Sequence, residues 1–414
     1  MSSEWTTSTL GEFLRLQRGH DLTSSDQKPG NVPVMGSAGP NGTHNEALAC
    51  GPGVVIGRSG ASIGRVHFSE ASYWPHNTCL YVTDFLGNNP KFAYYLLQTL
   101  NLAAYNSGSA QPSLNRNLIY TVPLQIPSRS EQDVIAKTLS ALDDRITLLR
   151  ETNQTLESIA QAIFKSWFVD FDPVRAKMEG RQPEGIDEET AALFPDSFEE
   201  SELGLIPKGW SVATIQSICE QISNGSTPSR SQVEYWKSGT IPWIKTGELA
   251  DGFLITSEES ITELALAKTS VKLLPEHSIL MAIYAAPTVG RLGVLTQPST
   301  FNQACTGLIA KKDVGTWFLF WTLLFGRAWF NSRANGAAQQ NISKKIVEGY
   351  ELVLPSTKML SKFDYLTSLL HKSVRANSEH IKTLSYLRDT LLPRLISGQL
   401  RLPEAQEQVE DALS

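Results

Sequence analysis

The sequence predicts a mixed α/β protein, with two tandem-duplicated α/β domains separated by a long antiparallel two-helix coiled coil. Three observations predict it: one long segment has heptad periodicity, a second such segment follows 228 residues later, and similar strand and turn segments precede each. The expected segments are a first domain (1–128), a central long helix with the start of a linker (129–180), an acidic linker (181–206), a second domain (207–356), a C-terminal long helix (357–402) and an acidic tail (403–414).

The central helix is predicted by two interleaved heptad series. One series is Ile135, Leu142, Leu149, Leu156 and Ile163, and the other, offset by four residues, is Leu139, Ile146, Asn153, Ala160 and Trp167. Such series place an apolar seam along one side of a helix, so the helix needs a partner. At its start, Ser130 with Asp133 predicts a capping box in which Asp replaces the usual Glu.

The C-terminal helix repeats the seam with some polar replacements. Its two series are Phe363, Leu370, Asn377, Leu384 and Leu391, and Thr367, Val374, Ile381, Arg388 and Leu395. Asn153 and Asn377 both interrupt the seam near mid-helix, and a buried Asn in a coiled coil fixes the register at a cost in stability. Antiparallel pairing with opposed centres puts both in one layer. We predict that they hydrogen-bond, because an unpaired amide there would be costly.

The segments that precede the two helices correspond in order, which indicates a tandem duplication. The corresponding runs are WTTSTLGEF at Trp5 with WSVATIQSI at Trp210, VPV at Val32 with IPW at Ile241, SIGRV at Ser62 with TVGRL at Thr288, and GSAQPSLN at Gly108 with GAAQQNIS at Gly336. The offset grows from 205 to 228 residues along the domain. The second copy therefore contains insertions, which loops tolerate.

Composition bounds the class of protein. A chain of 414 residues with 41% hydrophobic residues suggests two or three globular domains. No apolar run approaches the span of a bilayer, and the first residues lack a basic region followed by an apolar stretch, so we expect a cytoplasmic protein with no membrane contact. The four scattered cysteines are expected to be small buried apolar residues rather than a disulfide framework or a zinc site.

The net charge of -6 is unevenly distributed. Residues 181–204 hold eight acids against one base, and residues 403–414 hold four acids and no base. Outside these two stretches the chain has 35 basic and 30 acidic residues, and the segment 357–402 has eight bases against three acids. This mildly basic remainder permits contact with DNA.

Motifs of catalysis are missing from the sequence. The seven histidines include no His-Glu-x-x-His pair, and the glycine-rich GRSGASIG at Gly57 lacks the Gly-Lys-Ser/Thr ending of a phosphate-binding loop. NNPKF at Asn88 has Lys91 where the Asn-Pro-Pro-aromatic motif of amino methyltransferases has a second proline. We therefore expect a noncatalytic chain that binds no cofactor or metal itself.

Taken together, the duplication, the heptad helices and several long runs closely resemble the specificity (S) subunit of type I restriction-modification systems. The matching runs are GSTPSRSQVEYWKSGTIPWIKTGEL (from Gly225), AQAIFKSWFVDFDPVRAKMEG (from Ala160), LGLIPKGW (from Leu203) and LRDTLLPRLISGQL (from Leu387). The first domain has no clear counterpart of GSTPSRSQVEYW. Such a departure is expected if each domain reads a different DNA sequence.

This resemblance implies a function and partners. Each α/β unit would be a target recognition domain that reads one half of a bipartite double-stranded DNA site, and the coiled coil would space the two domains. Two modification subunits, which hold S-adenosylmethionine and methylate adenine N6, would dock on the chain. Two restriction subunits, which use ATP and Mg, could join them. The S subunit would supply only the choice of sequence.

Candidate base-reading residues are polar and lie on loops or hairpins. In the second domain they are Gln339, Gln340 and Asn341, whose amides suit adenine, with Lys344 and Lys345, which suit phosphate. The first-domain counterparts are Gln111, Ser113, Asn115 and Arg116, and the hairpins add Arg58, Arg65, Tyr284 and Arg291. Glutamine and asparagine after glycine are also common turn residues, so a structural role for these windows stays open.

Two other classes of function stay open at this point. The chain could be a noncatalytic coiled-coil scaffold whose domains bind protein, and salt-sensitive, sequence-selective DNA binding would separate this alternative from the first. It could also be a stand-alone methyltransferase, for which binding of S-adenosylmethionine by the isolated chain would be required.

Overall fold

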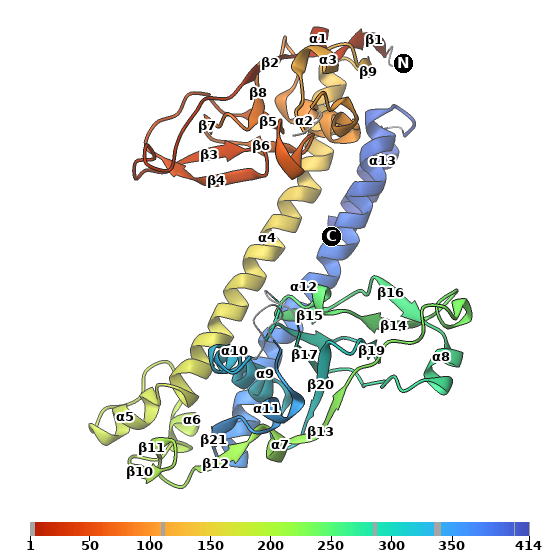
Figure 1. Ribbon diagram of the computed structural model, residues 1–414. Coiled ribbons are helices and arrows are strands. Elements are labelled where there is room, and N and C mark those ends of the chain that lie inside the picture. The colour runs from red at the N-terminus through yellow and green to blue at the C-terminus, as the bar shows by residue number, and fades with distance from the viewer. Residues whose placement is uncertain (1–4, 109–111, 285–287, 335–340, 401, 414) are drawn as a thin grey trace. The chain divides into compact units, whose positions relative to one another are not determined.

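The computed structural model describes residues 5–108, 112–284, 288–334, 341–400 and 402–413. The chain divides into two compact units, one of Met1–Leu148 with Ile381–Ser414 and one of Leu149–His380. Both boundaries fall inside the long helices α4 (Arg129–Phe168) and α12 (Thr357–Ile396) (Figure 1). Each unit therefore contains one α/β domain and one part of each long helix.

The domain of the first unit contains two small sheets and a closing strand pair. Its elements are β1 (Thr6–Thr9), α1 (Leu10–Phe13), β2 (Arg15–Arg18), β3 (Val32–Gly36), β4 (Gly39–His44), β5 (Gly53–Gly57), β6 (Val66–Ser69), β7 (Trp74–Pro75), β8 (Cys79–Asp84), α2 (Pro90–Thr99), α3 (Arg116–Ile119) and β9 (Pro123–Ile126). The strand orders are β2-β8-β5-β6 and β4-β3-β7. β1 pairs with β9, so the domain closes just before α4 begins.

The domain of the second unit has the same plan. Its elements are β12 (Ser211–Thr214), α7 (Ile215–Ile218), β13 (Cys219–Asn224), β14 (Ile241–Ile244), β15 (Gly252–Leu254), β16 (Glu259–Ile261), α8 (Glu263–Lys268), β17 (Ile279–Ala282), β18 (Leu292–Leu295), β19 (Thr300–Phe301), β20 (Cys305–Ala310), α9 (Thr316–Phe325), α10 (Arg327–Ser332), α11 (Lys344–Glu348) and β21 (Glu351–Leu354). Its orders, β13-β20-β17-β18-β15 and β16-β14-β19, repeat the first domain with β15 added at one edge. The predicted duplication is confirmed in the strand topology.

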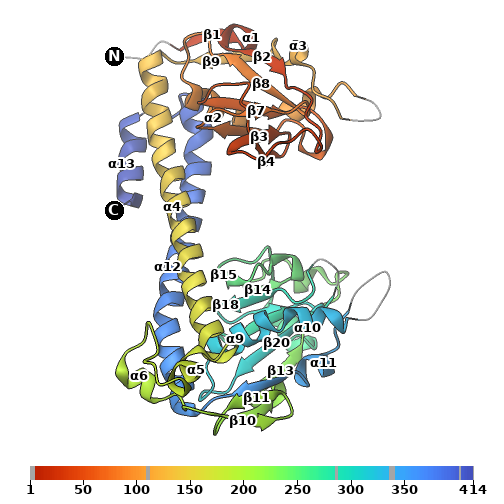
Figure 2. The ribbon, with the colours of Figure 1, turned by 90° about the vertical axis from the view of Figure 1, so that its left-hand side faces the viewer.

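The aromatic residues at the end of α4 belong to a hydrophobic core cluster of the second unit. Phe363 of α12 lies 5.8 Å from Phe164 and 5.0 Å from Phe168, measured between ring centroids. Phe318 of α9 lies 5.2 Å from Phe168, so α9 packs beside this part of the helix pair (Figure 2). The cluster anchors the domain to both long helices.

The antiparallel pairing of α4 with α12 in the second unit includes the predicted asparagine contact. Asn377 Nδ2 donates to Asn153 Oδ1 at 2.8 Å. Asn153 Nδ2 donates to the Val374 carbonyl at 3.3 Å and to Ser378 Oγ at 3.2 Å. The predicted hydrogen bond between the two amides is confirmed.

In the first unit, the polar seam residue Arg388 forms an ion pair with the other long helix. Arg388 Nη1 lies 2.9 Å from Asp143 Oδ1, which belongs to α4. Tyr95 of α2 donates its hydroxyl to the same carboxylate at 2.7 Å. Around this pair the seam is apolar and buried, with Leu139, Leu142, Leu384 and Leu391 fully inaccessible to solvent. The arginine thus links the helix pair to the domain.

Several element ends differ from those the sequence predicts. α4 is capped by Ser128, whose Oγ accepts from the Glu131 N–H at 3.4 Å, and not by Ser130. Asp133 instead accepts from Asn89 Nδ2 at 2.6 Å. The expected box fails because Asp133 is used to tie the helix to the start of α2. α12 ends at Ile396 instead of 402, shortly before Gly398, which has a left-handed φ of 72°.

The two acidic segments contain regular structure. The helix α5 (Asp172–Met178) precedes the acidic linker, which contains α6 (Glu188–Ala192) and the hairpin of β10 (Phe198–Ser201) with β11 (Gly204–Pro207). The expected tail forms α13 (Leu402–Leu413). Ala405 and Val409, four residues apart on one helix face, are buried. This apolar face, which the acidic composition conceals, explains why the segment is helical.

We predict opposite effects for single and double substitution of the asparagine pair. Asn153→Leu alone leaves the Asn377 amide without its partner and is expected to lower the free energy of unfolding by about 1–3 kcal/mol. Replacing both by Leu leaves no orphaned amide and extends the apolar seam, so this variant is expected to exceed the wild type in stability. Urea unfolding of the full chain measures both, and a large loss in the double variant would contradict the account.

Candidate nucleic-acid interface

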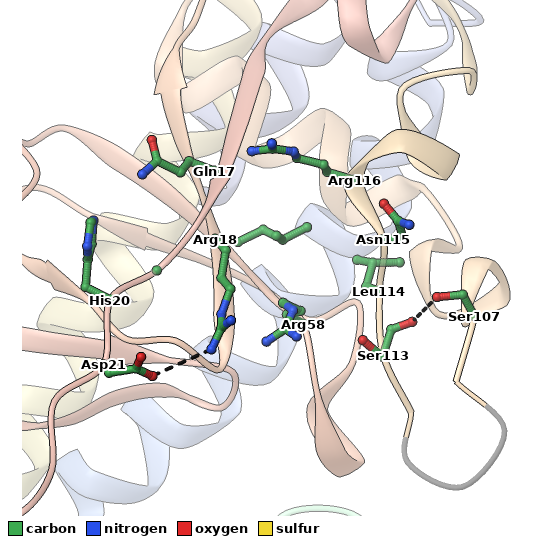
Figure 3. Close-up of a pocket in the computed structure, with 12 residues that line it drawn as sticks. Gln17, Arg18, His20, Asp21, Arg58, Ser107, Ser113, Leu114, Asn115 and Arg116 are labelled. Carbon is green, nitrogen blue, oxygen red and sulfur yellow. Dashed lines mark hydrogen bonds and ion pairs between the residues drawn. The ribbon is translucent and has the colours of Figure 1, made fainter.

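A hollow of about 750 Å³ lies in the first domain where β2 ends. Side chains from the strand end, the β5–β6 hairpin and the loop before α3 surround it (Figure 3). The lining residues are Gln17, Arg18, Gly19, His20, Asp21, Arg58, Leu80, Ser107, Ser113, Leu114, Asn115 and Arg116. The lining is polar and carries three arginines, which suits an anionic partner such as nucleic acid.

Main-chain hydrogen bonds fix the shape of this hollow. Leu114 N–H donates to the Arg58 carbonyl at 2.8 Å, and Arg58 N–H donates to the Thr78 carbonyl at 2.9 Å. A bridge between Ser59 and Ser113 continues the contact. Main-chain bonds therefore hold the hairpin and the loop before α3 together. Because side chains make none of these bonds, they can differ without loss of the contact.

At the end of β2, the backbone of Gly19 lies very close to the backbone just before β8. Gly19 N–H donates to the Cys79 carbonyl at 3.0 Å. A Cβ at Gly19 would lie 2.1 Å from the His76 carbonyl oxygen, far inside van der Waals contact. Only glycine fits here.

The three arginines are held to different degrees. Arg58 Nη1 donates to the Asn77 carbonyl at 3.0 Å, and Arg116 Nη1 donates to the Leu16 carbonyl at 2.9 Å. Arg18 instead lies 3.6 Å from Asp21, and its side chain is 55% exposed. Such an exposed ion pair contributes little, so the Arg18 guanidinium is the most available of the three.

The structure brings together four of the residues predicted for the first domain, Arg58, Ser113, Asn115 and Arg116. Asn115 also has a structural role, because its Oδ1 accepts from the Asn117 N–H at 3.0 Å and caps α3. Arg65 is exposed just before β6 and does not line the hollow. Gln111 lies outside the described residues.

Sequence reasoning missed the strand-end residues, among them Arg18, His20 and Asp21. One signal was available: with a one-residue insertion in the second domain, the match between the two domains aligns Arg18-Gly19-His20 with Asn224-Gly225-Ser226. The shared glycine marks the strand end, and the residues on either side of it differ.

The second domain has the same backbone frame. Gly225 N–H donates to the Cys305 carbonyl at 3.1 Å, and a Cβ at Gly225 would lie 2.2 Å from the Asn302 carbonyl oxygen. Ile342 N–H donates to the Ile283 carbonyl at 2.9 Å. These bonds make Ile283 equivalent to Arg58 and Ile342 equivalent to Leu114.

The predicted residues of the second domain lie around this frame. Tyr284, 38% exposed, forms a bridge with Asn341. Lys344 lies 3.1 Å from Glu348, one helical turn along α11, and Lys345 is exposed. The carboxylate partner makes Lys344 less available than Lys345 for a phosphate. Gln339 and Gln340 lie outside the described residues.

The hairpin arginines occupy equivalent positions. Gly57 N–H donates to the Arg65 carbonyl at 2.7 Å, and Ala282 N–H donates to the Arg291 carbonyl at 2.9 Å. Each arginine follows a glycine with a left-handed φ, 78° at Gly64 and 81° at Gly290. The two hairpins therefore present an arginine from the same place.

Two absences are found among the residues that the structure describes. Within the described ranges, none of the helices combines the length and apolar character needed to cross a membrane. Over the same residues, no group of three or more His, Cys, Asp and Glu side chains is placed to hold a metal ion.

The duplicated fold with its polar, arginine-bearing loops defines a DNA-recognition protein. The family model for the type I restriction modification DNA specificity domain matches residues 2–158 and 207–379. The chain belongs to this family, and it is an S subunit of a type I restriction-modification system. The resemblance seen in the sequence is confirmed.

Known relatives agree with this assignment. The type I restriction enzyme HindI specificity subunit of Haemophilus influenzae is 28% identical over 359 residues, which cover 75% of this chain and 77% of that protein. The MjaIX specificity subunit of Methanocaldococcus jannaschii is 27% identical over 359 residues, 85% and 78% of the two chains. The crystal structure of an S subunit from M. genitalium shares the fold, with a TM-score of 0.62 at 16% identity over 95% of this chain and 96% of that one.

We predict that the glycine at the end of β13 is required for full stability of the fold. Gly225→Ala forces a methyl group into the Asn302 carbonyl and is expected to lower the free energy of unfolding by about 2–3 kcal/mol. Gly247→Ala is the matched control, because a Cβ there meets no atom within 4 Å. Urea unfolding of the full chain measures both variants. Equal stability of the two would show that the backbones of Gly225 and Asn302 are not in close contact.

Proposed function

We propose that this S subunit reads a bipartite DNA target, one half with each domain, and leaves methylation and cleavage to partner subunits. One observation carries the proposal: the two domains have the same backbone frame, while the side chains on it differ. Serine at 113 corresponds to asparagine at 341, and arginine at 58 corresponds to isoleucine at 283. A common frame that carries different side chains at equivalent positions suits the reading of two different sequences.

The long helices support a spacing function. α4 and α12 have 40 residues each, about 60 Å at about 1.5 Å per residue. This length is commensurate with roughly 18 base pairs at about 3.4 Å each. Paired helices are stiff, so they would hold the two readers at a fixed separation and set the gap between the half sites.

Exposed apolar side chains on the helices support docking of partners. Tyr365, Leu369 and Tyr386 of α12 are 62%, 52% and 75% exposed, and Leu148 of α4 is 52% exposed. Tyr365 and Leu369 lie four residues apart on one side of α12, and neighbouring exposed apolar side chains are a feature of protein interfaces. We assign this role to two modification subunits, which would hold S-adenosylmethionine and methylate adenine N6. Two restriction subunits, with ATP and Mg, would join the same assembly.

The predicted window of the second domain provides a test of base reading. In the complex with its modification partner, Gln340→Ala with Asn341→Ala is expected to relax the sequence requirement at one half site by about 1–3 kcal/mol per lost base contact. The other half site is expected to stay unchanged. Mapping of methyladenine measures both, with Lys345→Ala as a control expected to weaken binding evenly. Even loss in the double variant would indicate a role in folding or phosphate contact instead.

The helix pair provides a test of spacing. Deleting residues 144–150 together with residues 380–386 removes one heptad from each helix and retains both the Asp143–Arg388 and Asn153–Asn377 pairs. Each helix shortens by about 10 Å, so the preferred gap is expected to shorten by up to about three base pairs. Methylation of DNA libraries with varied gaps measures this. An unchanged gap would reject the spacing function.

A further inference from the structure

The last residue of β2 and of β13 differs between the domains although the surrounding backbone is the same. Arg18 lies opposite Leu80 in β8, and Asn224 lies opposite Thr306 in β20. The glycine that follows each donates to the cysteine carbonyl that begins the opposite strand, at 3.0 and 3.1 Å. Because directly opposed residues lie on the same face of a sheet, each side chain has its cross-strand neighbour beside it.

In the first domain this neighbour suits an arginine. Leu80 lines the hollow and offers an apolar surface to the Arg18 stem. Among the described residues, no main-chain carbonyl holds the Arg18 guanidinium. Asp21, 77% exposed, lines the same hollow, lies 3.6 Å from Arg18 and accepts from Asn77 Nδ2 through one carboxylate oxygen. Arginine matches the O6 and N7 acceptors of guanine, and aspartate accepts from the amino group of the paired cytosine. Together they suit a G·C base pair.

In the second domain the neighbour suits an asparagine. Thr306 is buried, and its Oγ1 donates to Asn224 Oδ1 at 2.8 Å. In this arrangement the buried hydroxyl holds the Oδ1 side of the exposed amide, which leaves Nδ2 directed away from Thr306. The amide oxygen keeps a second lone pair, so the group can still accept from adenine N6 while its Nδ2 donates to N7. The threonine therefore pre-organises an adenine contact.

We infer that this strand-end position selects a base in each half site, guanine at Arg18 and adenine at Asn224. The inference rests on the proposed function and adds the residue and the class of base to it. Arg58 and Arg116, which are held by main-chain carbonyls, supply positive charge around Arg18 but not the choice of base. The residue on the opposite strand takes part in this selection, because Leu80 supports Arg18 and Thr306 supports Asn224.

The experiment exchanges the strand-end residue and its cross-strand neighbour between the two domains, in the full chain assembled with its modification partner. Arg18→Asn is expected to reduce discrimination for guanine at one position of one half site by about five- to hundredfold. Adding Leu80→Thr is expected to create a preference for adenine at that position. Asn224→Arg with Thr306→Leu is the reciprocal change in the second domain, and it is expected to create a preference for guanine there. Arg15→Asn is the matched control, because Arg15 lies on the same strand and does not line the hollow.

Methylation rates over a library of target variants give the result. A change confined to one position for each variant, with the Arg15 control unchanged, supports the inference. Two results would overturn the inference and leave the proposed function standing. One is an equal loss of methylation rate over all target sequences after Arg18→Asn. The other is a two-part target in which Arg18→Asn changes the preference at no guanine. A wild-type target without two parts contradicts the proposed function itself.

Discussion

The apolar seam of the two long helices is the constraint on which the structure depends. Neither heptad series can be left in water, and each compact unit buries its own part of both. The strand pairs β1–β9 and β12–β21 then close each domain at the start of a long helix. A duplicated unit of domain plus helix therefore produces two similar structures, each completed by a helix from the other copy.

The polar residues in this seam specify the pairing at some cost in stability. The Asn153–Asn377 hydrogen bond forms only in one register, and a slip by a heptad would leave both amides buried and unpaired. Arg388 is satisfied by Asp143, which also accepts from Tyr95. The same carboxylate of Asp143 thus contributes both to the pairing of the helices, through Arg388, and to the attachment of the first domain, through Tyr95.

Much of the fold was predictable because its signals are local or repeated. Heptad spacing predicted both helices and the asparagine contact, and matching runs predicted two domains with one topology. Helix ends were less predictable, because Asp133 is diverted to Asn89 and the acidic composition of α13 conceals an apolar face at Ala405 and Val409. The strand-end residues were missed because strand pairing brings Arg18 opposite Leu80, 62 positions later in the sequence. The windows around Gln111, Gln339 and Gln340 stay predictions.

The central claim is that two equivalent readers are held at a set distance. The most direct measurement is a map of methyladenine in DNA from cells that contain the modification partner, with and without this gene. The account predicts methylation that depends on the gene, at a motif of two short defined parts separated by a gap of one constant length. A continuous motif, or two parts whose separation varies freely, would contradict it.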